Sequence, residues 1–215
     1  DHEQDGMLTL SQIIHKSSNI GIVKIAEKIG PISLYKTSQN FGFGSKTGIS
    51  LKGESKGKLS PVKNWSAVSL GQIAMGHEVG VTALQLAMAY SAIANGGFLL
   101  KPRIIKQIID NNENIIYEEK TKIIRKVSDK NTMNTIRKML RGVVSKGTGH
   151  NAEISGWEIA GKTGTAQKFK NGKYSNNQFI SNFIGFFPYD DPQLLTFIML
   201  DEPEMPYHWG AEGAA

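Results

Sequence analysis

The sequence predicts an α+β fold, in which an antiparallel sheet packs against helices and is accompanied by a mainly helical lobe. Three observations predict it. Residues 1–96 combine helical spacing with glycine-rich loops, residues 97–215 contain several short apolar segments, and the last three of these segments have short connections. Short connections favour antiparallel neighbours. We therefore expect one domain over residues 1–215, with a mainly helical lobe at about 1–96 and a sheet lobe at about 97–215.

Helices alternate with loops in the first lobe. Apolar residues between positions 18 and 30 recur at helical spacing, and Gly30 followed by Pro31 ends this pattern. Residues 42–57 are rich in glycine and predict a loop or a short hairpin. Residues 81–97 are apolar on nearly all sides, with Thr82 as the N-cap and Gly96 beyond the end, which predicts a buried helix.

The second lobe changes to strands. Residues 102–119 predict two strands around a polar turn, and residues 128–144 predict a capped helix with Ile136, Leu140 and Val143 on one face. Three apolar segments then follow. They span 156–167, 179–188 and 193–203, and the polar segments 168–177 and 189–191 are expected to be the turns between them.

The amino-acid composition limits the classes of function that the chain can have. With 40% hydrophobic and 20% charged residues, 215 residues form a globular domain or a large part of a two-lobed one. The net charge of +6 is scattered, so we expect a solvated surface and no nucleic-acid partner. The absence of cysteine excludes disulfides and thiol catalysis. No apolar run is long enough to span a membrane and the first residues have no signal-peptide character, so any targeting segment is expected outside these residues.

Residues 156–163, GWEIAGKT, match the P-loop pattern G-x-x-x-x-G-K-[ST]. A P-loop requires a buried strand before the first glycine and a helix that begins at the lysine. The preceding residues are polar and glycine-rich, and no periodic apolar residues follow Lys162. We therefore predict that Lys162 lies on a strand and that the motif binds no nucleotide.

Two short motifs suggest a polar site. Ser17 and Asn19 precede a predicted helix, where such residues are usually N-caps, but they can also present a hydroxyl and an amide to one cavity. On the predicted strand, alternation places Thr163 and Thr165 on one face and Lys162 with Gly164 on the other. Two hydroxyls can bind a carboxylate, and a glycine lets another segment approach the backbone.

Taken together, SSN at 17–19 and KTGT at 162–165 resemble the second and third motifs of the penicillin-binding proteins. Residues 76–105 and 183–203 further resemble the class B, monofunctional peptidoglycan transpeptidases, particularly the cell-division type. The resemblance covers nearly the whole chain. It implies a fold like that of the serine β-lactamases and D,D-transpeptidases.

The resemblance implies serine acyl transfer that cross-links peptidoglycan stem peptides ending in D-Ala-D-Ala, and inhibition by β-lactam antibiotics. Ser17 would relay protons, Asn19 would hold the substrate amide and Lys162 would stabilise the Ser17 hydroxyl. Thr163 and Thr165 would bind the terminal carboxylate, beside Gly164, and the Thr165 N–H would form half of the oxyanion hole. No metal or cofactor is implied. The site would lie at the extracytoplasmic face of the bacterial cytoplasmic membrane, with division or elongation membrane proteins as partners.

The chain departs from the pattern of this family at the nucleophile. The family places its nucleophilic serine in S-x-x-K upstream of the SxN motif, and the sixteen residues before Ser17 contain no such pattern. The pattern occurs only downstream, at 33–36, 55–58 and 60–63, about as often as chance predicts. We therefore expect the nucleophile to lie outside this chain, and the chain alone to be inactive. The resemblance also implies a continuation past Trp209-Gly210 into a final strand, so the domain is expected to be incomplete at both ends.

The sequence supports other functions less well. A Ser-His-Asp hydrolase is disfavoured because the G-x-S-x-G match at residues 53–57 lies in the stretch predicted as a loop or short hairpin, so no nucleophile elbow is expected there. A metal site is disfavoured because the five histidines form no H-x-x-x-H pair. A β-lactamase or β-lactam sensor of the same superfamily is disfavoured by the class B signature. A non-catalytic binding or scaffold domain stays open as an alternative.

Overall fold

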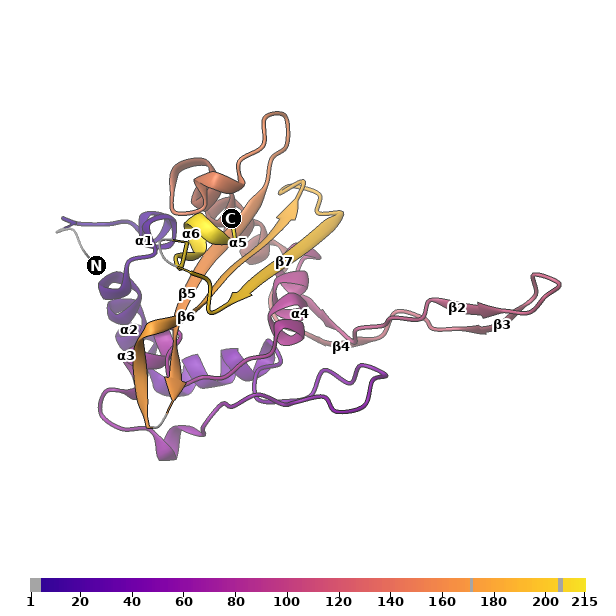
Figure 1. Cartoon of the computed structure of the whole chain (residues 1–215), viewed down its shortest axis with the longest axis horizontal. Helices are drawn as coiled ribbons and strands as arrows, with labels where there is room; N and C mark the ends of the chain where they lie inside the picture. Colours follow the sequence, from indigo (N-terminus) through magenta and orange to yellow (C-terminus); the bar gives the residue numbers. More distant parts are fainter. Residues whose placement is uncertain (1–4, 171, 205–206) are drawn as a thin grey trace.

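The computed structural model describes residues 5–170, 172–204 and 207–215, and an antiparallel sheet lies at its centre (Figure 1). Its three strands, in spatial order, are β5 (Ala160–Lys170), β6 (Lys173–Phe187) and β7 (Leu194–Asp201). Each strand pairs antiparallel with its neighbour in sequence, which confirms the predicted meander. The α+β fold class is therefore confirmed, and β5, which carries the KTGT motif, lies at one edge of this sheet.

The helices predicted over residues 81–97 and 128–144 both form. In α4 (Ala83–Ala94), Thr82 is the N-cap, as predicted: its Oγ1 accepts a hydrogen bond from the Gln85 backbone N–H over 3.1 Å. In α5 (Lys130–Lys146), the N-cap Asp129 accepts one from the Thr132 N–H over 2.9 Å. Both helices pack on the sheet in one cluster, which consists of Leu140, Ala160 and Phe186 with Tyr90, Ile93, Ala94, Ile136, Tyr189 and Leu195.

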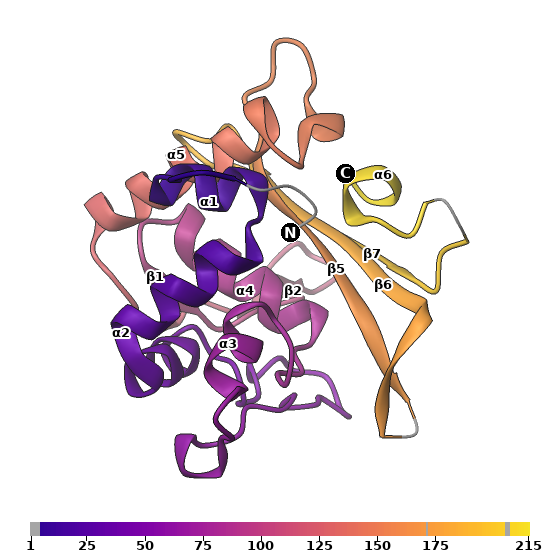
Figure 2. The same cartoon turned by 90° about the vertical axis from the view of Figure 1, so that its left-hand side faces the viewer.

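The sheet separates the C-terminal helix from the other lobe. Figure 2 views the sheet nearly edge-on, with α6 (Gly210–Gly213) on one side and the first helices of the chain on the other. Those first helices are α1 (Leu10–Lys16), α2 (Asn19–Asn40), the 3-10 helix η1 (Val62–Asn64) and α3 (Ser69–Ala74). In the described part of the chain, no helix is both long and apolar enough to cross a membrane.

The predicted end of a helix at Gly30 is confirmed as a break inside α2. Gly30 has φ 78° and ψ 163°, which no residue in a continuous helix adopts. The helical conformation resumes at Pro31, because proline suits the first turn of a new helix, where its missing N–H is not needed. The helix over residues 31–40 is not predicted from the sequence. Residues 42–57 form a loop, where the Glu54 carboxylate accepts hydrogen bonds from the N–H groups of Thr47 and Gly48.

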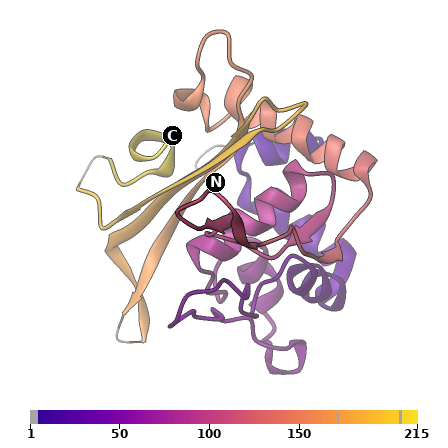
Figure 3. The same cartoon turned by 90° about the vertical axis from the view of Figure 1, so that its right-hand side faces the viewer.

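Two small antiparallel pairs connect the lobes. The predicted pair over 102–119 forms as β2 (Gln107–Ile109) and β3 (Ile115–Glu118). It projects from the body of the molecule as a thin arm (Figure 1), and its strands are exposed on both faces. At its base, β1 (Phe98–Leu100) pairs with β4 (Ile123–Lys126), a pairing that the sequence does not predict. In Figure 3 the arm points toward the viewer, in front of the body of the molecule.

One expectation about the sheet lobe is wrong. The polar segment 168–177 is not a turn, because β5 continues to Lys170, β6 begins at Lys173, and Gly172 between them has φ 80°. This part of the hairpin extends beyond the sheet as a two-stranded ribbon, so it does not need the apolar alternation of a buried strand. The residues that follow Trp209 form α6 on the face of the sheet.

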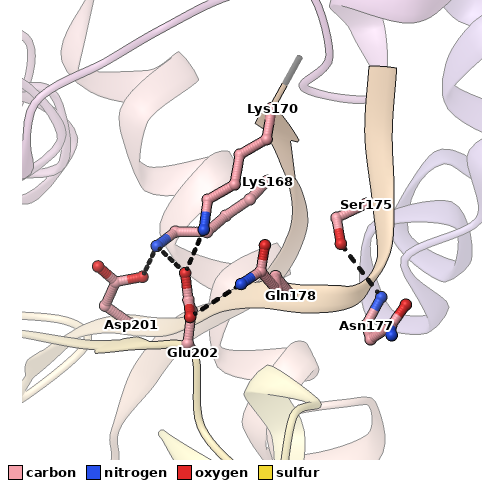
Figure 4. A network of polar contacts seen from close by, with 7 residues as sticks. All are labelled: Lys168, Lys170, Ser175, Asn177, Gln178, Asp201 and Glu202. Carbon is pink, nitrogen blue, oxygen red and sulfur yellow. Dashed lines mark hydrogen bonds and ion pairs between the residues drawn. The ribbon is translucent and has the colours of Figure 1, made fainter. Parts of the chain in front are cut away.

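A polar network holds the ribbon at its base (Figure 4). Glu202, at the end of β7, accepts hydrogen bonds from Lys168 (2.7 Å), Lys170 (2.9 Å) and Gln178 (3.1 Å). Lys168 also pairs with Asp201 over 2.5 Å. The hydrogen bonds from Lys168 and then Lys170 lower the pKa of Glu202 to about 2. The carboxylate is therefore fully ionised at neutral pH, and its stabilising contribution is lost only as the pH falls from the ordinary carboxyl range towards 2.

A second contact holds the ribbon to the helical lobe. The Tyr174 hydroxyl accepts a hydrogen bond from the Glu78 N–H over 3.2 Å, and the Tyr174 ring meets those of His77 and Phe169 edge-on at 4.8 and 5.1 Å. His77 and Glu78 belong to the loop between α3 and α4. The ribbon therefore lies against both lobes.

We expect Glu202→Gln to loosen the ribbon without unfolding the domain. Glutamine keeps the shape but removes the charge that holds two lysines, and exposed ion pairs contribute little to global stability. Hydrogen exchange at neutral pH should become faster in residues 165–170 and 173–178 and stay unchanged in residues 181–187. Glu118→Gln, the same change on the exposed strand β3, serves as the control. Unchanged exchange in the ribbon of Glu202→Gln would contradict an anchoring role for this carboxylate.

Candidate active site

Ser17 and Lys162 meet where the helical lobe touches the sheet. The Lys162 ammonium donates a hydrogen bond from Nζ to Ser17 Oγ over 2.8 Å, although 145 residues separate the two in sequence. Nζ also donates to the Thr163 carbonyl over 3.1 Å. The structure therefore brings together one residue from each of the two motifs.

Ser17 lies at the junction between α1 and α2. Its φ of 56° and ψ of 42° place it in the left-handed region, which costs energy for a residue with a side chain and is often found at functional sites. Ser18 is the N-cap of α2, since its hydroxyl accepts a hydrogen bond from the Gly21 N–H over 3.1 Å. An N-cap role for Ser17 or Asn19 is therefore wrong. Asn19 is the first residue of α2 and is exposed, two residues from Ser17.

Lys162 lies on β5, two residues after its buried start at Ala160. Burial lowers the pKa of the Lys162 ammonium to about 8, because the charged form loses its hydration. Near neutral pH the side chain is mostly charged, yet a base of this strength can also exchange protons. The arrangement can hold a neighbouring hydroxyl in place and assist the transfer of its proton.

The two threonines of the motif share a face, as strand alternation predicts. In the register, Thr163 lies opposite Phe183 and Thr165 lies opposite Ser181, while Gly164 lies opposite Asn182. A Cβ at position 164 would come within 2.7 Å of the Asn182 amide oxygen. Glycine at this position therefore leaves room for the Asn182 side chain.

Each threonine hydroxyl has a protein partner that the sequence does not indicate. Thr163 Oγ1 lies 2.9 Å from Thr148 Oγ1, and Thr165 Oγ1 accepts a hydrogen bond from the Gly210 N–H over 2.9 Å. Thr148 follows α5 and Gly210 begins α6. No motif or periodicity marks either residue, because both contacts arise only when distant segments pack together.

The three S-x-x-K patterns lie away from these residues. The pattern at 33–36 lies in α2 beyond the break at Gly30, and the stretch from Asn19 to Gly30 alone spans about 16 Å. Those at 55–58 and 60–63 lie in the long connection before α3, where only 62–64 form a short 3-10 helix. Within the described ranges, none of their serines or lysines is hydrogen-bonded to Ser17 or Lys162.

The P-loop interpretation is excluded by the backbone. The motif lysine lies inside β5, which continues to Lys170, so no helix begins at this position. Residues Ile154 and Trp157 form an isolated bridge before the strand, and Gly156 lies in the turn between them. The backbone therefore lacks the helix N-terminus that a P-loop uses to bind phosphate.

Known proteins resemble this chain over nearly all of its length. The family profile described as penicillin binding protein transpeptidase domain matches residues 1–215. Stage V sporulation protein D of Bacillus subtilis is 41% identical over 98% of this chain and 33% of its own length. Peptidoglycan D,D-transpeptidase FtsI of Buchnera aphidicola is 37% identical over 97% of this chain and 35% of its own length. The chain therefore spans about a third of these curated relatives.

A solved structure is also similar. The crystal structure of penicillin binding protein 3 from Mycobacterium tuberculosis, complexed with ampicillin, matches with a TM-score of 0.88 and 34% sequence identity. The match covers 94% of this chain and 47% of that one. The similarity therefore extends over most of both lobes.

Proposed function

The chain belongs to the penicillin-binding protein transpeptidase family, and from this premise we propose that it carries two of the three active-site motifs of a peptidoglycan D,D-transpeptidase. The observation that carries the proposal is the hydrogen bond from Lys162 Nζ to Ser17 Oγ. It joins an SxN hydroxyl to a KTG ammonium across the two lobes. A domain that merely kept the family's shape would have no need of a lysine that is costly to bury or of a serine in a left-handed conformation.

The proposed reaction is an acyl transfer. A serine Oγ attacks the carbonyl carbon of the penultimate D-alanine, the bond from that carbon to the nitrogen of the terminal D-alanine breaks, and this nitrogen takes up a proton. The acyl group then passes to the amine of a second stem peptide, which releases the serine. A β-lactam would be attacked in the same way at its ring carbonyl, with the ring C–N bond as the one that breaks.

The residues of this chain act on the departing nitrogen and on the terminal carboxylate. Ser17 delivers the proton to the nitrogen, and Lys162 holds the Ser17 hydroxyl and lowers the energy of its deprotonated form. Thr163 and Thr165 donate hydrogen bonds to the carboxylate, and Gly164 leaves space at the strand. Asn19 holds the amide of the substrate, and the Thr165 N–H stabilises the oxyanion.

We further propose that the nucleophilic serine is contributed by residues outside 1–215. The order of motifs supports this, since the S-x-x-K patterns of the chain all follow Ser17 and lie away from Lys162. The relatives are also about three times as long as the chain. Residues 1–215 alone should therefore form no covalent adduct with benzylpenicillin in intact-protein mass spectrometry, whereas the full-length protein should gain one.

The two arms of this experiment separate the alternatives. An adduct on residues 1–215, mapped by peptide digestion to Ser33, Ser55 or Ser60, would show that the nucleophile lies within the chain. A full-length protein that forms no adduct, although it is folded, would contradict the proposed activity and would favour a scaffold domain without catalysis.

The proposed substrate indicates where in the cell the site works. Peptidoglycan stem peptides lie outside the bacterial cytoplasmic membrane, so we propose that the site works at the extracytoplasmic face of that membrane. Membrane proteins of cell division or elongation are the proposed partners. The name of one relative, stage V sporulation protein D, supports a role in sporulation.

A further inference from the structure

The hydroxyls of Thr163 and Thr165 each contact a protein group that fixes the direction of the hydrogen bonds at the site. A carboxylate accepts hydrogen bonds and cannot donate them, so a site for it must supply donors. A threonine hydroxyl has one donor and two acceptor positions and rotates freely. Whether it presents its proton to a ligand therefore depends on what else it contacts.

At Thr165 the direction is fixed by a backbone group. The Gly210 N–H can only donate, so Thr165 Oγ1 must accept, and its own proton is left for another acceptor. Gly210 is buried, and a Cβ there would lie 2.3 Å from the Gly164 carbonyl oxygen and 2.7 Å from that of Asn182. Only glycine allows α6 to come this close to the strand, and the donor is therefore held in place by packing.

At Thr163 the corresponding partner is a side chain. Thr148 Oγ1 lies 2.9 Å from Thr163 Oγ1, and either hydroxyl can be the donor. If Thr163 donated to Thr148, its lone pairs would face an incoming anion. An anion at the strand therefore selects the arrangement in which Thr148 donates to Thr163 and Thr163 donates to the anion.

The position of Thr148 is set by the element that carries Ser17. The Thr148 N–H donates to the His15 carbonyl over 3.1 Å, two residues before Ser17 at the end of α1. Gly147 allows this approach, since a Cβ there would lie 2.2 Å from the same His15 oxygen. The turn after α5 therefore links α1 to the motif strand and fixes the Thr148 hydroxyl between them.

We propose that Thr148 is a positioning residue that makes Thr163 a hydrogen-bond donor, as the Gly210 N–H does for Thr165, so that the strand selects a ligand with an anionic terminus. The inference rests on the proposed function and adds a residue outside both motifs. It acts through Thr163 and assigns no contact with the substrate to Thr148. Removing it should weaken recognition of the carboxylate and leave the acylating machinery intact.

The test compares two β-lactams that differ in the carboxylate. The full-length protein and its Thr148→Val and Thr148→Ser variants are treated with benzylpenicillin and with its methyl ester, and the second-order acylation rate constants are measured. Thr148→Val should slow the reaction of the acid by about 3- to 10-fold, the effect of one ordinary hydrogen bond, and leave that of the ester unchanged. Thr148→Ser, which keeps the hydroxyl, should stay within about twofold of wild type for both.

Two results would overturn the inference. One is an equal loss for acid and ester in Thr148→Val, which would indicate a structural role alone. The other is an unchanged rate for the acid. A failure of the proposed function is distinct from both, because the wild-type protein would then react with neither β-lactam.

Discussion

Replacing Lys162 by alanine in the full-length protein is expected to slow acylation by benzylpenicillin about 10²- to 10⁴-fold, the range for losing a group that assists proton transfer. The Lys162 ammonium is the donor that holds Ser17 Oγ at 2.8 Å, and it lies on the strand proposed to bind the carboxylate. Alanine removes the donor and the charge together. The expected loss is therefore larger than for any single hydroxyl of the site.

Loss of Lys162 should not lower the stability of the protein, so a slower acylation cannot be attributed to unfolding. Burial lowers the pKa of Lys162 from 10.5 to about 8, and this shift corresponds to a destabilisation of about 3 kcal/mol while the lysine is charged. Lys162→Met fills the space with an uncharged chain of similar length. It should lose acylation as Lys162→Ala does and unfold at the same or a higher temperature than wild type.

The pH dependence provides a second measurement on the same residue. Because the folded pKa lies below the unfolded one, the penalty is full below pH 8 and is relieved as the pH rises from 8 to 10.5, so the stability of wild type relative to Lys162→Met should rise over that range. Acylation should decline above about pH 8, where the charge is lost. Lys162→Arg keeps its charge and should lack this decline. Wild-type acylation in Lys162→Ala would exclude the role assigned to this lysine.

The amphipathic elements could be predicted from the sequence because local chemistry determines them. Apolar spacing and a capping threonine define α4, Gly30 defines the break in α2, and short connections define the antiparallel order of β5, β6 and β7. The extent of the ribbon is not predicted, because its residues other than Phe169 and Tyr174 are polar and show no apolar alternation. Its Asn171-Gly172 pair, a common sequence in hairpin turns, was the signal that could have located it.

The prediction of the candidate site depends more on the resemblance to a known family than on the residue pattern of the chain. Ser17 and Lys162 are 145 residues apart, and no periodicity predicts that they touch; the two motifs were joined because their order matches a known family. Thr148 and Gly210 belong to no motif. Their importance follows from where α5 and α6 end and begin against β5, which depends on tertiary packing.

Thr165→Val is expected to reduce acylation of the full-length protein by about 10- to 150-fold, the equivalent of 1.5 to 3 kcal/mol for one hydrogen bond to a charged group. Valine keeps the β-branched shape that suits a strand, and the backbone N–H proposed for the oxyanion hole stays in place. What is lost is the proton that Thr165 is proposed to donate to the carboxylate.

The substitution should also affect the fold, through Gly210. The Gly210 N–H is buried and donates to Thr165 Oγ1, so valine leaves it without this acceptor, at a cost of about 1 to 3 kcal/mol in stability. Thr165→Ser keeps the oxygen and is the matched control: it should retain stability and acylate within about threefold of wild type. Rate and thermal unfolding must therefore be measured on both variants, well below the unfolding temperature of Thr165→Val. A valine variant that acylates at the wild-type rate would refute the carboxylate role of this strand, and so would one whose lost rate equals its unfolded fraction. A serine variant as slow as valine would show that the methyl group, and not the hydroxyl, is what the site requires.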